Sequence, residues 1–300
     1  MKKMKFKLLR YLGLAKLFRF FFQRNRVSIV LLHDISPSSA DMIFKYLSKS
    51  YNLIDLNSFI KAHKTKDYSK IPKYAMIVTF DDGHRGNIEI LEAIKRYKAP
   101  VTIFLCAGII NTKRHFWFLY KKSSIAISKL KRKSNKERLA ILAKDGFFQD
   151  KEYETPQALN KKEIEKLSKY VNMQSHTLFH PILPMCSDID SKEELVKSKE
   201  ILEKEYKFDI NTISYPNGDY SSRDIALAKE AGYECGITVD FGFNTLESDI
   251  FRLKRISLND TDDINELIVK ASGLWAFLKS RNGKKQSYGY CKEPIREYEK

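Results

Sequence analysis

Residues 74–84 read YAMIVTFDDGH, an apolar run that ends in two adjacent carboxylates and a glycine. A short run that is apolar on both faces is typical of a strand buried in a parallel sheet. Asp81 and Asp82 then stand at the strand end, where parallel α/β folds carry their active sites. Adjacent strand residues point in different directions, so one carboxylate can bind a cation while the other accepts a proton. A turn with two solvated aspartates is the alternative.

Similar runs recur along the chain and alternate with helix-like segments. The predicted strands are Val27 to Leu32, Tyr74 to Phe80, Val101 to Leu105, Val171 to Gln174, Thr212 to Tyr215 and Cys235 to Val239. The predicted helices are Ala40 to Tyr51, Asn87 to Tyr97, Lys161 to Tyr170, Ser191 to Glu205, Ser222 to Ala231 and Asp262 to Leu278. This alternation predicts a parallel sheet covered by helices, either a barrel or a doubly wound sheet.

The domain organisation follows from the segments that interrupt this alternation of strands and helices. We expect a basic, apolar helix over residues 1–25, one domain over 26–278 and a loose polar tail over 279–300. Residues 111–154 interrupt the domain as a basic, aromatic insertion of one or two helices. Its His115 and Trp117 either contact a ligand or anchor the insertion to the rest of the domain.

Charge narrows the class of partner. The chain carries 54 Lys and Arg against 37 Asp and Glu, a formal charge of +17, which favours an anionic partner. No RNA-binding signature accompanies the basic stretches, so we expect no nucleic-acid partner. The first 26 residues hold nine Lys and Arg, no acid and many Leu and Phe. Residues 1–24 are therefore predicted to lie on an anionic membrane surface, or else to pack on the domain.

Location and metal chemistry are constrained by two further features. No export signal is recognisable, so we expect a cytoplasmic protein, peripheral on the inner membrane face. The four cysteines are widely spaced, which favours reduced thiols. Structural zinc sites usually draw on closely spaced cysteine pairs, so any metal should sit on His and carboxylate.

Two histidines supply such ligands. His176 and His180 follow the predicted strand Val171 to Gln174 within SHTLFHP, residues 175–181. On a helical turn, a spacing of four residues places both imidazoles on one face. Together with a carboxylate from another strand end, they predict a divalent-metal site with coordination positions left open for water and substrate.

At these residues the chain resembles the polysaccharide deacetylase family, carbohydrate esterase family 4. Thr79 to Gly83 and His176 to Pro181 are similar to its first two motifs, and Ile213 to Gly218 to its third. The likeness covers roughly residues 26–260. It implies a distorted (β/α) barrel of about seven parallel strands, in a single catalytic domain with a helical insertion.

The resemblance also implies an activity and residue roles. The activity is removal of an acetyl group from an N-acetylated amino sugar in a glycan or a glycolipid precursor. Asp82, His176 and His180 resemble the metal triad, Asp81 the general base, and Asn217 the residue whose backbone N–H stabilises the oxyanion. Zinc is the favoured ion, with nickel, cobalt, iron and manganese left open.

The sequence departs from the family pattern in two places. No histidine follows His180 to serve as general acid. His33 instead resembles the N-terminal histidine of a permuted subgroup that acts on poly-N-acetylglucosamine; a buried structural histidine is the alternative. Ser214 stands where many members carry an arginine that holds the catalytic aspartate, and Arg252 or Arg255 could take its place.

Several readings of the substrate and activity remain open. The substrate expected is an acetylated glycan or a lipid-linked sugar, and phosphate-bearing precursors would suit the net charge. An O-acetyl esterase would use the same chemistry. An inactive glycan-binding or membrane-scaffold protein is the third reading, against which stands the intact polar cluster.

Overall fold

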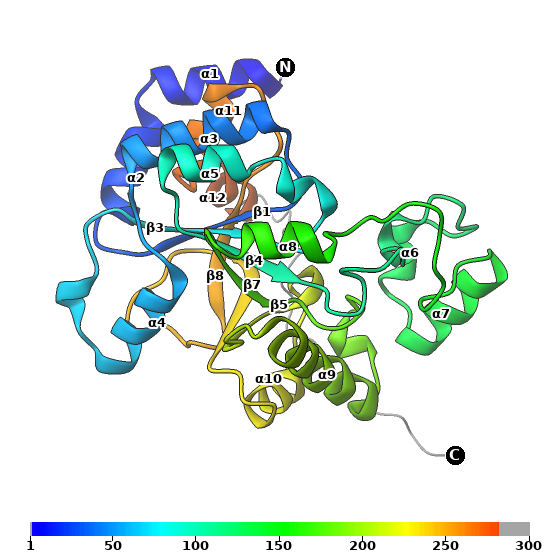
Figure 1. The fold of residues 1–300 in the computed structure, drawn as a ribbon. Coiled ribbons are helices and arrows are strands. Elements are labelled where there is room, and N and C mark those ends of the chain that lie inside the picture. Colours follow the sequence, from blue (N-terminus) through cyan, green and yellow to red (C-terminus); the bar gives the residue numbers. More distant parts are fainter. Residues whose placement is uncertain (1, 282–300) are drawn as a thin grey trace.

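The apolar run of residues 74–80 forms strand β3 in the computed structural model, which describes residues 2–281. Parallel pairing continues in the order β1, β3, β4, β5, β6, β7, β8 and back to β1, so the sheet closes into a barrel (Figure 1). The barrel strands are β1 (Ser28–Leu32), β3 (Ala75–Phe80), β4 (Val101–Leu105), β5 (Val171–Ser175), β6 (Thr212–Ser214), β7 (Cys235–Phe241) and β8 (Leu253–Ser257). The predicted seven-stranded (β/α) barrel is confirmed.

Helices surround this barrel. They are α1 (Lys2–Tyr11), α2 (Leu14–Gln23), α3 (Pro37–Ser50), α4 (Leu56–Thr65), α5 (Leu91–Tyr97), α6 (Ile127–Leu130), α7 (Asn135–Lys144), α8 (Lys161–Leu167), α9 (Asp188–Tyr206), α10 (Ser222–Glu230), α11 (Ile264–Ala271) and α12 (Leu274–Arg281). Capping residues determine where some of these helices begin. Ser221 and Asp224 form a reciprocal N-terminal cap on α10, and Asn160 and Glu163 form one on α8. Helices α6 and α7 of the insertion lie to one side of the barrel (Figure 1).

Some elements differ from the sequence-based prediction. Strand β8, the two-residue strand β2 (Asn52–Leu53) beside β3, and helix α4 were not predicted. The single helix expected over Asp262 to Leu278 is two helices, because Gly273 adopts a left-handed φ of 82° between them. Gly13, with a φ of 72°, likewise divides the N-terminal helix.

Smaller shifts affect two other predicted elements. The start of the predicted helix Asn87 to Tyr97 belongs to a 3₁₀ turn, Arg85–Ile88. Helix α12 continues to Arg281 and so includes the first three residues of the predicted tail; residues 282–300 lie outside the described part of the chain.

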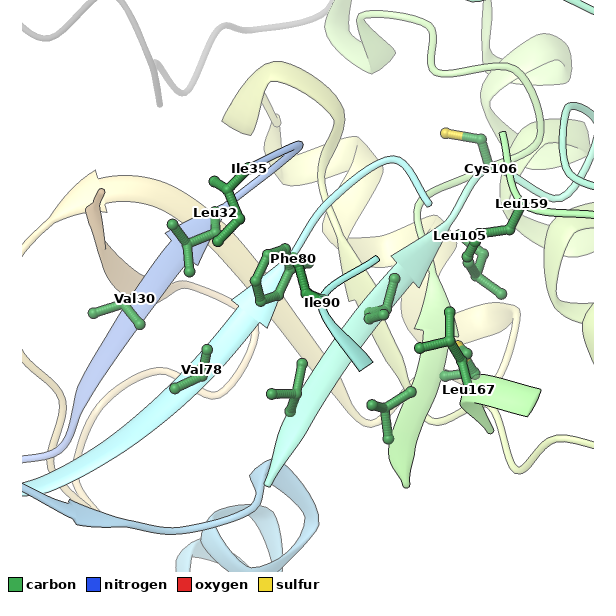
Figure 2. Packing of buried hydrophobic residues seen from close by; sticks show 14 of the residues in the cluster. Val30, Leu32, Ile35, Val78, Phe80, Ile90, Leu105, Cys106, Leu159 and Leu167 are labelled. Atoms are coloured by element: carbon green, nitrogen blue, oxygen red, sulfur yellow. The ribbon is translucent and has the colours of Figure 1, made fainter. Parts of the chain in front are cut away.

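Apolar side chains fill both faces of the barrel wall. Val30, Leu32, Val78 and Phe80 face the outer helices in a layer shown in Figure 2. A second cluster gathers alternate strand residues with one face of α4: Ile29, Ile77, Phe104, Ile237 and Leu253 with Leu56, Phe59 and Ile60. Because alternate residues share a face, Leu31 and Asp81 continue this inner row toward the strands' carboxyl ends. Helix α4 therefore packs at one end of the barrel interior, and a cavity opens at the other.

Two sequence expectations can be compared directly with the fold. Cys106, Cys186 and Cys235 are buried free thiols, as predicted, and Cys291 lies outside the described residues. Within residues 2–281, no helix has the length and apolar character needed to span a membrane.

Candidate metal centre and active site

The two aspartates after β3 are buried, with exposed fractions of 3% for Asp81 and 2% for Asp82. Asp82 and Gly83 both adopt left-handed backbone, with φ of 75° and 70°. A Cβ on Gly83 would lie 2.6 Å from Leu105 Cδ2, so the turn requires glycine. The turn directs the two carboxylates to different partners, and the alternative of two solvated aspartates is wrong.

Asp81 is held by an arginine from β8. Arg255, itself 1% exposed, donates from both terminal nitrogens to the two carboxylate oxygens at 2.8 Å each. It also donates to Ser214 Oγ at 3.0 Å and, through Nε, to the Thr238 carbonyl at 2.7 Å. Burial would raise the pKa of Asp81, but the charge of Arg255 outweighs it and lowers the pKa. The sequence left Arg252 and Arg255 open as the arginine that holds Asp81. Arg255 holds it, whereas Arg252 lies at the surface.

The two histidines converge with Asp82. His176 Nε2 and His180 Nε2 each lie 3.4 Å from Asp82 Oδ1, and one ligand atom from each of the three residues falls within 4.8 Å of the others. The expected helical turn is wrong: the histidines lie in the loop after β5, where Thr177 and His180 have φ of 67° and 57°. Left-handed residues cost about 1–3 kcal/mol each and persist where the surroundings dictate them.

The donor set fits a divalent cation. Asp82 Oδ1 is buried, faces both Nε2 atoms and has no hydrogen-bond partner, an arrangement that a cation would satisfy. His176 Nδ1 lies 2.7 Å from the Ser214 carbonyl, which assigns the proton to Nδ1 and leaves Nε2 a lone pair. Burial lowers the pKa of His180 to about 3, so its imidazole is neutral, as ligation requires.

The charge balance around Asp82 also favours cation binding. Burial would raise its pKa, but the neighbouring imidazoles of His176 and His84 outweigh burial and hold it well below the usual range. His84 Nε2 lies 2.9 Å from Asp82 Oδ2. Burial would lower the pKa of His176, but Asp81 and Asp82 raise it, so a proton and a cation compete for His176 Nε2.

A buried glutamate supports the histidine loop. Glu194 of α9 accepts hydrogen bonds from the backbone N–H groups of Leu178 and Phe179, at 2.8 and 2.9 Å, between the two histidines. Burial raises its pKa to about 7. The sequence predicted the helix but not this residue, because a single Glu among many on α9 carries no signal of its own.

A cavity of about 380 Å³ opens above these groups. His33 lines it and is solvent-exposed rather than buried, so the alternative of a buried structural histidine does not hold. Desolvation by the surrounding protein lowers the pKa of His33, although the charges of Asp82 and Asp81 oppose this shift. Asn217 also lines the cavity, with a left-handed φ of 57°. The neighbouring Gly218 N–H is engaged by the Tyr215 carbonyl at 2.8 Å.

The insertion forms part of the cavity wall. Phe118 lines the cavity, with its ring centroid 4.5 Å from that of His180. Trp117 is buried and donates from Nε1 to the His180 carbonyl at 2.8 Å. His115 stacks on Tyr153 at 4.2 Å and does not line the cavity. Trp117 therefore anchors the insertion to the loop after β5, whereas His115 stacks on another residue of the insertion; Phe118 and Lys131, which were not predicted, line the cavity.

The fold and the site define a (β/α)-barrel protein with an Asp-His-His candidate metal centre at the strands' carboxyl ends. The chain belongs to the polysaccharide deacetylase family, whose model matches residues 69–236. This finding agrees with the likeness of the Asp81–Asp82 and His176–His180 motifs.

Individual relatives are distant. A poly-beta-1,6-N-acetyl-D-glucosamine N-deacetylase of Staphylococcus aureus is 25% identical over 243 residues, covering 80% of this chain and 73% of that protein. A putative polysaccharide deacetylase, YxkH, of Bacillus subtilis is 21% identical over 185 residues; the match covers 61% of this chain but only 51% of that protein. The structure of Streptococcus pyogenes deacetylase PplD in complex with acetate superposes with a TM-score of 0.61 at 18% identity, covering 83% and 99% of the two chains.

Proposed function

We propose that the protein is a metal-dependent hydrolase that removes the acetyl group from an N-acetylated amino sugar. The convergence of Asp82, His176 and His180 beside a carboxylate held by Arg255 carries this proposal. Family membership and the S. aureus relative, named as an N-deacetylase, support the same reaction.

Asp82, His176 and His180 are proposed to hold one divalent cation, for which zinc is favoured because it accepts mixed imidazole and carboxylate ligation. When bound, such an ion supplies Lewis acidity to the acetyl carbonyl and acidifies water. The protein's own contribution is to keep Asp82 ionised and both Nε2 atoms available.

Asp81 is proposed to act as general base. Its lowered pKa keeps the carboxylate ionised at neutral pH, and the two hydrogen bonds from Arg255 fix its orientation toward the cavity. Asp81 Oδ2 lies 3.9 Å from His176 Nε2, which places this carboxylate beside the proposed metal ligands.

His33 is proposed to protonate the departing amine, since it lies in the same cavity and is accessible to a substrate. The backbone N–H of Asn217 is proposed to stabilise the oxyanion, because the left-handed turn places this residue on the cavity wall. An O-acetyl substrate would use the same groups, so the substrate assay must detect amine as well as acetate.

The first test measures metal content together with acetate and free amine released from an N-acetylglucosamine oligomer. Wild type should bind about one ion and release both products, while Asp82→Asn should lose both properties. Asp262→Asn, a carboxylate whose side chain is 86% exposed, is the matched control and should behave as wild type. Acetate without amine would point to an O-acetyl ester, and failure of wild type to bind metal would refute the proposal.

We also propose an anionic membrane surface, on the cytoplasmic side, as a partner, with lipid-linked sugars among the substrates. Helices α1 and α2 pack Phe6, Ala15 and Phe18 against α11 and α12. Their other faces leave large apolar side chains exposed: Met4, Leu8, Tyr11, Leu12, Leu14, Leu17, Phe20, Phe21 and Phe22. Nine Lys and Arg and no acid accompany them within the first 26 residues, which suits an anionic bilayer.

Vesicle flotation tests the proposed binding to an anionic membrane. The protein should float with phosphatidylglycerol vesicles and not with phosphatidylcholine vesicles, and Leu17→Ser with Phe21→Ser should abolish flotation. Phe148→Ser, on the insertion and 49% exposed, is the control for loss of one exposed aromatic residue. Flotation that is unchanged in the double variant would exclude α2 as the contact.

A further inference from the structure

We propose that Lys131 makes the catalytic cavity selective for an acetylated sugar that carries an anionic group, a phosphate or a carboxylate, beside the acetylated ring. This inference rests on the proposed deacetylase function and adds a substrate class to it. Lys131 belongs to the insertion and not to the barrel.

Lys131 reaches the cavity from the insertion. It caps the C-terminus of α6, lines the same cavity as Asp81, Asp82 and both candidate histidine ligands, and donates from Nζ to Asn217 Oδ1 at 2.5 Å. This contact joins the insertion to the turn after β6, across 86 residues of sequence. The ammonium therefore lies beside the residue proposed to stabilise the oxyanion.

The charge of Lys131 is held in a partly desolvated position. Burial lowers its pKa, against the charges of Asp219 and Asp82. Asp219 also accepts a hydrogen bond from Asn217 Nδ2 at 2.6 Å, so Lys131, Asn217 and Asp219 form one polar network. Because Lys131 lines the cavity while Trp117 anchors the insertion, the ammonium is in a position to contact a substrate that enters the cavity.

Lys131 lines the cavity, and the charges of Asp219 and Asp82 favour its protonated, cationic form. Asp81 is neutralised by the ion pair with Arg255, which does not itself line the cavity. The insertion that carries Lys131 contains twelve Lys and Arg against five Asp and Glu over residues 111–154. Its field should attract an anionic substrate to the cavity, and Lys131 would then contact the charged group directly.

Equilibrium binding tests the proposal independently of turnover. Titration calorimetry would compare N-acetylglucosamine 1-phosphate, N-acetylmuramic acid and the neutral methyl glycoside of N-acetylglucosamine. Wild type should bind at least one of the two anionic sugars about tenfold more tightly than the neutral one. Which of them is preferred distinguishes phosphate from carboxylate.

Substitutions test whether Lys131 causes the preference for anionic sugars. Lys131→Met should reduce the ratio of anionic to neutral affinity to about one, and Lys131→Arg should retain most of it. Lys129→Met, which removes an exposed lysine of the same helix, should leave the ratio unchanged. Thermal unfolding of each variant checks that the fold is intact.

Two outcomes would overturn the inference: equal wild-type affinity for all three sugars, or an unchanged preference in a folded Lys131→Met variant. Failure of the deacetylase proposal would look different, because wild type would then release no acetate from any substrate whatever its binding preference.

Discussion

Arg255 shows how a residue of one strand replaces a motif residue of another. Ser214, on β6, is too short to reach around Asp81, but its Oγ accepts from Arg255 and lies 3.2 Å from Asp81 Oδ2. The guanidinium from β8 thus enters the space that a small side chain at position 214 leaves. The carboxylate is held bidentately although the family's arginine is absent from its usual position.

Removing this arginine should damage both stability and turnover. Arg255→Met leaves Asp81 buried without its partner, and we expect a loss of about 3–5 kcal/mol in the free energy of unfolding. Acetate release should fall on the order of a hundredfold, because a misplaced base loses much of its effect. Urea unfolding and product assays measure the two losses.

Arg252→Met is the control for Arg255→Met, since the Arg252 side chain is 44% exposed and pairs with Asp249 at the surface. Its stability should change by less than about 0.5 kcal/mol. Equal effects of the two variants would contradict the assignment of Arg255.

The raised pKa of Glu194 predicts how the stability of the metal-free protein depends on pH. Its pKa is raised from 4.5 to about 7 by burial, so the folded state binds the proton more tightly than the unfolded state. Stability should therefore fall as pH rises from about 4.5 to about 7, by up to roughly 3 kcal/mol from this group. Glu194→Gln keeps an acceptor for Leu178 and Phe179 without the charge, and should remove that part of the slope.

Urea unfolding of wild type and Glu194→Gln across this pH range measures the difference, in which the contributions of all other groups cancel. Parallel stability curves for the two proteins would show that Glu194 does not titrate in this range.

The site residues were predictable to different degrees. Asp82, His176 and His180 follow strands whose apolar pattern is plain, and strand ends meet in a barrel, so their convergence could be predicted. Arg255 could only be named beside Arg252, because an arginine that points into a barrel looks like a surface residue in sequence. The four left-handed residues at the site, Asp82, Thr177, His180 and Asn217, are imposed by tertiary contacts and left no comparable signal.

At the level of elements, β8 and α4 were the longest segments that sequence patterns missed. In β8 (LKRIS), Lys254 is exposed and Arg255 is buried, so charged side chains occupy both faces and conceal the strand. In α4, the residues that pack against the barrel interior are separated by polar ones, and the packing partner is remote in sequence. Both elements form because the closed barrel provides their packing surfaces.

Helix α4 should nevertheless be essential to stability. Phe59 is fully buried in the cluster with Ile29, Ile77 and Leu253, so Phe59→Ala should lower the free energy of unfolding by about 3–5 kcal/mol. Phe148→Ala, at a position 49% exposed, removes the same side chain from the surface and should cost less than about 0.5 kcal/mol. A Phe59→Ala loss below about 1 kcal/mol in urea unfolding would mean that this cluster collapses around the deletion.

For the whole molecule, the closed barrel brings Asp82 together with the sequence-distant pair His176 and His180 in one preformed donor set. Asp82 comes from the turn after β3, whereas His176 and His180 come from the loop after β5, two strands further around the barrel. The unfolded chain has no such set, so a cation that binds there must stabilise the fold. This linkage can be measured without any substrate.

Zinc at a hundred times its dissociation constant should stabilise the wild-type protein by about 2.7 kcal/mol, and should raise the unfolding temperature on the order of 5 °C. A chelator should reverse the shift. Asp82→Asn should abolish it, whatever that variant's stability without metal, because the neutral amide cannot replace the carboxylate between the two Nε2 atoms. Asp262→Asn should keep the full shift, since its carboxylate is exposed and does not line this cavity. The same zinc-dependent shift in Asp82→Asn would place the stabilising ion elsewhere on the protein and would remove the basis for the proposed chemistry.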